Sequence, residues 1–171
     1  MTDFPATTDH VGRLMALRRL EMPGVPLDGM AILARARRLD QLSRKPIETV
    51  FDRYGLDSGE FDVLATLQRG GPPYEMRPTE IFQSLLITSG GLTDRLNRLV
   101  KKGLVERIEP ANDRRSLPVR LSERGLDVIR RAYAEDMEVE RALLSGLTEK
   151  DRVALAHLLA KLLADIEAKK S

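Results

Sequence analysis

Residues 78–125 contain two short helical segments followed by two alternating segments, and this order restricts the fold more than any other feature. PTEIFQSL (78–85) begins with proline, which is favoured in the first turn of a helix, and carries apolar residues at helical spacing. LITSGGLTDRLNRLVKKG (86–103) also repeats apolar residues at helical spacing, with Thr88 as the predicted N-cap, and ends in two lysines and a glycine. The sequence therefore predicts two helices separated by a short turn.

The chain then changes from a helical to an alternating pattern. LVERIEP and LPVRLS alternate apolar and polar residues, and PANDRRS between them is rich in turn formers, so the three segments predict a β-hairpin. A helix, a short turn, a second helix and a hairpin occur in this order in a winged helix-turn-helix. We therefore expect a mainly α fold with a small β-hairpin wing. Its second helix would enter the major groove of DNA, and its hairpin would reach the neighbouring backbone or minor groove.

The polar face of the second helix carries side chains suited to DNA. Its first turn is small and uncharged, so the backbone can approach base edges closely; Arg98 and Lys101 suit phosphates, and Asn97 suits a base or a phosphate. An ordinary solvated face would also explain these residues, and tight packing against residues 78–85 would also explain Gly90-Gly91. The candidate DNA-binding residues on this helix are Thr88, Ser89, Gly90, Thr93, Asp94, Asn97, Arg98 and Lys101.

Positive charge is concentrated in the same part of the chain. Residues 88–131 contain 11 basic and 6 acidic residues, a net charge of +5, whereas the net charge is −1 for residues 1–87 and −2 for residues 132–171. Such a block is found in proteins that bind polyanions, and it is also found as a solvated basic face. Arg114 and Arg115 lie at the crest of the predicted hairpin turn and are further candidates for contact with DNA.

Helices are also predicted on both sides of the winged helix-turn-helix. Apolar spacing predicts helices over 8–21, 27–44, 46–55, 57–69, 122–145 and from Thr148 onward, and Pro46 is expected to interrupt the second of them. The leucines and alanines of 27–44 and of the last helix would cover either a second copy of the chain or the chain's own core. We expect one domain, in which 8–54 and 122–171 form a helical dimerisation region and 57–121 form the DNA-binding region.

The run TSGGLTDRLNRLVKKGLVERIEPANDRRSLPVRLSERG (88–125) resembles the MarR family of bacterial transcriptional regulators. The matching parts are LVKKGLVER, the wing tip Asp113-Arg114-Arg115 and VRLSERG, and the order of the flanking helices also fits. The resemblance implies a homodimer that reads a pseudo-palindromic operator in double-stranded DNA, most often as a ligand-responsive repressor. It further implies that Arg115 enters the minor groove and that Asp113 braces it. Arg114 would contact a phosphate or remain solvated.

Two features depart from the shortest members of that family. The loop RGGPPYEMR is longer, and we predict no strand in it, while the helix over 8–21 looks like the N-terminal extension of some ligand-responsive members. The resemblance also implies a small aromatic or anionic effector, bound between the dimerisation helices and the winged helix. Aromatic residues at the relevant positions are also explained as plain core. The candidate effector-binding residues are Arg38, Phe51, Tyr54, Phe61 and Asp62.

Composition disfavours several other functions. The chain has no cysteine, which excludes thiol-based peroxide sensing, and it lacks the tryptophan that urate-responsive relatives carry. Its two histidines, His10 and His157, are far apart, and no nucleophile or metal-ligand pattern is visible, so we predict no enzyme, cofactor or metal. No apolar run is long enough to span a membrane and no signal peptide is visible, so a cytoplasmic protein without a membrane partner is expected. The alternative function is a winged-helix module that binds protein without specific DNA binding.

Overall fold

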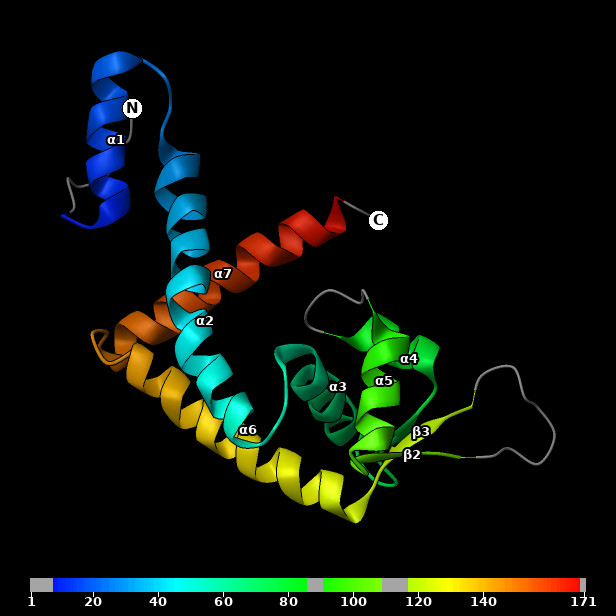
Figure 1. Cartoon of the computed structure of the whole chain (residues 1–171). Helices are drawn as coiled ribbons and strands as arrows, with labels where there is room; N and C mark the ends of the chain where they lie inside the picture. Colours follow the sequence, from blue (N-terminus) through cyan, green and yellow to red (C-terminus); the bar gives the residue numbers. More distant parts are fainter. Residues whose placement is uncertain (1–7, 86–90, 109–116, 170–171) are drawn as a thin grey trace. The chain divides into compact units, whose positions relative to one another are not determined.

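The computed structural model describes residues 8–85, 91–108 and 117–169 of the chain (Figure 1). The chain divides into two compact units, residues 1–46 and 47–171. Most described residues are helical, and a small antiparallel sheet is present in the second unit. The predicted fold class, mainly α with a β-hairpin wing, is confirmed.

The first unit contains α1 (His10–Glu21), the π-helical turn η1 (Met30–Ala34) and the first part of α2 (Arg35–Arg53). Asp9 caps α1, because its carboxylate accepts hydrogen bonds from the backbone N–H groups of the first turn. Val11 and Met15 of α1 pack with Ala31 of η1 in a small apolar cluster. A salt bridge of 2.9 Å between Asp9 and Arg35 joins the start of α1 to the start of α2.

Only part of the apolar set of α1 is buried in the single chain. Val11 is buried, but Leu14, Leu17 and Leu20 are exposed in the single chain. The helix packs through the i, i+4 pair Val11 and Met15 instead, because residues four apart lie on the same face.

The predicted interruption at Pro46 is wrong. A single helix, α2, runs from Arg35 to Arg53 with Pro46 inside it. A proline in a helix interior removes one backbone hydrogen bond, but the residues that follow it still reach the core of the second unit. Val50 is fully buried there and Phe51 is nearly so. Burial of these side chains favours continuation of the helix beyond the proline.

The second unit forms its core between α3 (Ser58–Arg69), α4 (Pro78–Ser84), α5 (Leu92–Lys101), the sheet and α6 (Glu123–Leu143). Leu64 and Leu67 of α3, Ile81 of α4 and Leu99 of α5 are fully buried in this core, and Ile129 joins them from α6. The helix-turn-helix and the following long helix therefore lie where the apolar periodicity predicts them. In Figure 1, α4 and α5 are green and α6 changes from yellow to orange.

The sheet contains three strands in the order β1-β3-β2. The antiparallel pair β2 (Val105–Arg107) and β3 (Val119–Leu121) confirms the predicted hairpin, with Val105 opposite Leu121. The prediction that RGGPPYEMR contains no strand is wrong, since β1 (Glu75–Met76) pairs with β3. A two-residue strand has too little alternation to be read from sequence, and it exists because β3 offers a second free edge.

The last helix, α7 (Glu149–Ala168), begins where it was predicted, with Thr148 as its N-cap. The hydroxyl of Thr148 and the carboxylate of Asp151 form a capping box. None of the described residues of α7 is buried in the single chain, and the side chains of Leu158 and Leu163 are 66% and 56% exposed. Within the described part of the chain, no helix is long and apolar enough to cross a membrane.

Candidate nucleic-acid interface

The second helix of the helix-turn-helix, α5, separates apolar from polar residues as predicted. Leu92, Leu96 and Leu99 are buried, so the opposite side of the helix is left for other contacts. Polar side chains cover that side. The exposed candidates for DNA contact are Thr93, Asp94, Asn97, Arg98 and Lys101.

The start of α5 differs from the prediction. Gly91, rather than Thr88, is at the N-cap position, and its φ of 74° lies in the left-handed region that glycine adopts readily. Among the described residues, no atom lies within 4 Å of where a Cβ of Gly91 would be, so a close neighbour is not the reason for this glycine. The backbone turn into the helix is the reason. Thr88, Ser89 and Gly90 lie outside the described residues, and their contacts with DNA stay predictions.

The tip of the wing also lies outside the described residues. Asp113, Arg114 and Arg115 belong to this part of the chain, so their roles on DNA stay predictions. The described base of the wing is held by a buried valine on each strand, Val105 and Val119. On the exposed side of the sheet, Arg120 and Glu106 form a long ion pair of 3.6 Å.

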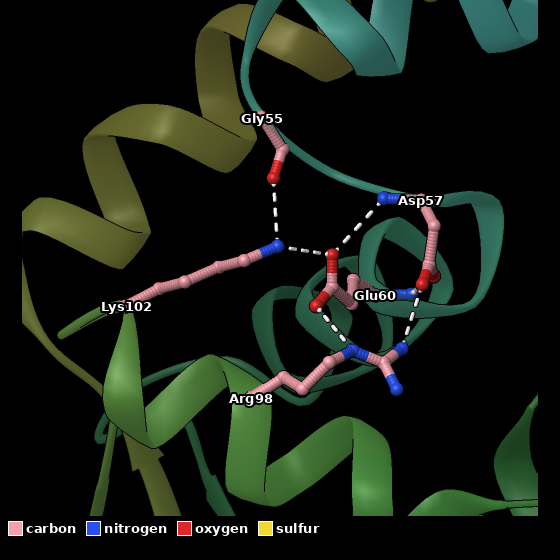
Figure 2. Close-up of polar contacts among 5 residues, drawn as sticks. All are labelled: Gly55, Asp57, Glu60, Arg98 and Lys102. Carbon is pink, nitrogen blue, oxygen red and sulfur yellow. Dashed lines mark hydrogen bonds and ion pairs between the residues drawn. The ribbon is translucent and has the colours of Figure 1, made fainter.

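An ionic cluster joins α5 to the start of α3, and sequence reasoning missed it (Figure 2). Its centre is Glu60, whose side chain is only 1% exposed. Arg98 donates from Nε to Oε1 of Glu60 at 3.0 Å, and Lys102 donates from Nζ to Oε2 at 2.6 Å. Each oxygen of the buried carboxylate therefore has a cationic donor, Arg98 of α5 or Lys102 at the C-cap of α5, which offsets the cost of burying the charge.

The same cluster includes the cap of α3. Asp57 and Glu60 form a capping box, with hydrogen bonds of 2.8 Å and 3.0 Å between each side chain and the other residue's backbone N–H. Arg98 also donates to Oδ2 of Asp57 at 2.6 Å, and Lys102 donates to the carbonyl oxygen of Gly55 at 2.8 Å. The hydrogen bond to Glu60 raises the pKa of the Arg98 guanidinium above its ordinary value. Two adjacent turns of α5 are thus tied to residues 55–60.

This cluster gives Arg98 a contact that the sequence analysis did not assign. The residue is a candidate for phosphate contact, but two carboxylates of the same chain hold its guanidinium. Its contact with DNA stays a prediction. The chain separation between Glu60 and its partners is about forty residues, so no local spacing could have indicated the cluster.

A second contact joins α5 to the wing. Nη2 of Arg107, the last residue of β2, donates to Oδ1 of Asn97 at 2.8 Å. Val105 and Arg107 lie on the same face of the strand, since alternate residues share a face. Val105 packs in the core, and Arg107 extends beyond the core toward α5. Asn97 is a predicted DNA contact, whereas Arg107 is not among the predicted residues.

The candidate effector residues fall into both units of the chain. Arg38 lies in the first unit, where it is exposed and donates to Gln41. Phe51 and Phe61 are buried in the second unit and stack with their ring centroids 4.0 Å apart. Tyr133 of α6 extends this stack, with its ring 6.2 Å from that of Phe61. The two phenylalanines therefore belong to the core, which was the alternative explanation for them.

The other two candidates have polar neighbours. Asp62 is buried on α3. The hydrogen bond between Tyr54 and Glu135 raises the pKa of the Tyr54 phenol, and the guanidinium of Arg131 lies 5.8 Å from the centre of the Tyr54 ring. The role of all five candidates in binding an effector stays a prediction.

Asp136 of α6 is a buried carboxyl group that the sequence analysis did not identify. Its side chain is 4% exposed, and Oδ1 has no hydrogen-bond partner among the residues that the structure describes. Burial, together with the charge of Glu140, raises the pKa of Asp136 to about 6. The folded protein therefore binds a proton here more tightly than the unfolded chain, whose aspartate pKa is about 3.9.

We expect Asp136→Asn to make the protein more stable by about 3 kcal/mol at pH 8 and by about half as much at pH 5. Stability contributed by a raised carboxyl pKa is fully present only below the unfolded pKa of about 3.9, and it is lost as the pH rises from there through the folded pKa, here about 6. Urea unfolding of both proteins at the two pH values measures the effect. Glu138→Gln, an exposed change on the same helix, is the control. An equal difference at both pH values would show that Asp136 is already ionised in the folded protein at pH 5.

Taken together, these features define a class of protein. A helix-turn-helix core presents the polar side of its second helix next to an antiparallel wing, and both lie in the basic part of the chain. This is the architecture of winged-helix DNA-binding proteins.

Comparison with known proteins gives the family. The MarR family model matches residues 54–116. Over 143 residues, the chain is 36% identical to the HTH-type transcriptional regulator PecS of Dickeya dadantii (strain 3937), an alignment that covers 84% of this chain and 86% of PecS. The chain belongs to the MarR family and is a DNA-binding transcriptional regulator.

Solved structures share the fold. A mutant of MarR from E. coli in complex with operator DNA is 24% identical, with a TM-score of 0.65 over 91% of this chain and 99% of that chain. The organohalide-sensing regulator RdhR in its 2,4-dichlorophenol-bound form is 18% identical, with a TM-score of 0.71 over 83% of this chain and 82% of that chain.

Proposed function

We propose that the protein binds a pseudo-palindromic DNA operator as a homodimer and acts as a ligand-responsive repressor. The observation that carries the DNA part is the exposed polar face of α5, which lies next to the wing in the basic block of the chain. The MarR mutant of the same fold, solved with operator DNA, supports this mode of binding. A two-fold dimer would place its recognition helices about 34 Å apart, one turn of DNA.

The unburied apolar side chains of α7 support the homodimer. Leucines that are more than half exposed in the single chain, such as Leu158 and Leu163, would be buried against a second copy. The dimerisation region proposed here comprises residues 8–54 and 122–171. A cytoplasmic location and the absence of enzymatic activity are part of the same proposal, and the regulator relatives support both.

An effector is the second part of the proposal. RdhR binds 2,4-dichlorophenol on the same fold, which supports a small aromatic or anionic effector for this protein. The contacts of Tyr54 suit a polar ring substituent, since the phenol is hydrogen-bonded to Glu135 and the guanidinium of Arg131 lies near the ring. Addition of such a compound to the complex with DNA would release the protein if the proposal is correct.

Selection of bound sequences from a pool of random double-stranded DNA tests the function. We expect an inverted repeat with half-site centres about 10 base pairs apart. Binding should weaken steeply as salt concentration rises, because each neutralised phosphate releases counterions. A winged-helix module that binds only protein would enrich no sequence.

We expect Arg115→Ala to weaken operator binding by about 1–3 kcal/mol and to leave the dimer intact. The reason is the loss of a cation that the family resemblance places in the minor groove. Titration of a labelled operator measures the affinity, and sedimentation velocity measures the dimer. Arg114→Ala is the matched control, since the two arginines are adjacent but only Arg115 is assigned to the groove. Equal losses for both variants would contradict a special role for Arg115.

A further inference from the structure

The hydrogen bond between Arg107 and Asn97 has a chemical consequence for the recognition helix. A guanidinium group has only donors, whereas a carboxamide has a donor end and an acceptor end. Arg107 can therefore hydrogen-bond to Asn97 only through Oδ1, as the structure shows at 2.8 Å. This contact fixes which end of the Asn97 amide faces the wing.

The position of Asn97 makes this orientation relevant to DNA. Thr93, Asn97 and Lys101 are spaced four apart on α5 and are all exposed, so they form one stripe of the helix. Arg98 and Lys102, by contrast, turn to Glu60 of α3. The polar surface of α5 is therefore divided between a side tied to α3 and a side next to the wing, with Asn97 on the latter.

We propose that Arg107 is a specificity-determining residue that acts through Asn97. By holding Oδ1, the guanidinium prevents the Asn97 amide from turning over and leaves its two N–H donors for an acceptor on a base edge in the major groove. An amide that turns freely would meet donor and acceptor edges alike and would discriminate less between base pairs. Arg107 is thus a positioning residue for base recognition, and this inference rests on the DNA-binding function proposed above.

The test compares base preferences rather than affinity alone. Sequences bound from random DNA are determined for the full-length wild type, Asn97→Ala, Arg107→Met and the double variant. We expect each single variant to relax the preference at the same base pair of each half-site by about fivefold or more. The double variant should relax it no further, because the two residues act as one unit. Arg107→Lys, which keeps a donor of similar reach, should retain the preference.

A matched control addresses the charge of Arg107. Arg120→Met removes a cation from the neighbouring strand, where the residue faces Glu106 instead of α5. We expect this control to leave all base preferences unchanged. Thermal unfolding of each variant tests whether the fold is kept. We expect no loss of stability, because the side chains of Asn97 and Arg107 are exposed.

Two results would overturn the inference. If Arg107→Met weakens binding to all sequences equally and reduces the number of counterions released on binding by about one, Arg107 is a phosphate contact only. If Asn97→Ala keeps every base preference, Asn97 does not read a base and Arg107 has nothing to orient. These two results differ from a failure of the proposed DNA-binding function, in which the wild-type protein itself would enrich no sequence.

Discussion

Glu60→Gln should lower the free energy of unfolding by about 2 kcal/mol, because a hydrogen bond to a charged group contributes about 1.5–3 kcal/mol to stability. The variant keeps the size of the side chain and an oxygen that can accept from the backbone N–H of Asp57, so the capping box can survive. It loses the charge that Arg98 and Lys102 share, and one of these cations then faces an amide NH2 group. Urea unfolding measures the change.

The functional effect of the same variant should be larger than its stability effect implies. Glu60 ties two turns of α5 to α3, and so it fixes the orientation of the recognition helix. We expect operator affinity to fall by about tenfold or more while the dimer remains, because a small displacement of a positioned helix disturbs several contacts at once.

Asp127→Asn is the control for charge. It also removes one carboxylate from an ion pair, that between Asp127 and Arg131, but both side chains are more than 60% exposed. Exposed pairs of this kind contribute about 0–1 kcal/mol. If Glu60→Gln resembles this control in stability and in operator affinity, the ionic cluster does not hold α5.

The double substitution Leu158→Glu and Leu163→Glu should convert the protein to a monomer and abolish tight operator binding. Both side chains lie on the apolar side of α7, and a carboxylate buried without a partner in an interface costs several kcal/mol. The chain's own core should tolerate the change, because none of the described residues of α7 is buried in it. Removal of the chain from Thr148 onward should have the same result. Sedimentation velocity and operator titration measure the two effects.

His157→Glu with Ala164→Glu is the matched control for this pair. Both positions are exposed and lie on the side of α7 opposite Leu158 and Leu163. The control substitutions introduce the same number of carboxylates. We expect the control to remain a dimer. A dimer for the Leu158 and Leu163 variant would contradict the assignment of α7 to the interface.

The sequence was sufficient to predict the elements that depend on local spacing. Helical periodicity and terminal signals placed α3, α5, α6 and α7, and the predicted helix starts at Asp57 and Thr148 are the N-caps of α3 and α7. The change to alternation located the hairpin of β2 and β3. These features could be predicted because each depends on residues within about one turn or one strand of each other.

Other features depend on contacts between distant segments, and the sequence did not indicate them. The helix through Pro46 continues because Val50 and Phe51 are buried by other elements. The strand β1 exists because β3 pairs with it. At the candidate site, helical spacing predicted which side of α5 is exposed, while the DNA contacts of that side stay predictions. The contacts of Arg98 with Glu60 and of Asn97 with Arg107 depend on the tertiary structure.

The ionic cluster at Glu60 also changes how many positive charges the DNA encounters. The basic block contains Arg98 and Lys102, but Asp57 and Glu60, which lie outside that block in the sequence, neutralise them. Cations that are already paired within the protein displace few counterions from a phosphate backbone. The number of ions released on operator binding should therefore be smaller than the number of lysines and arginines in residues 88–131.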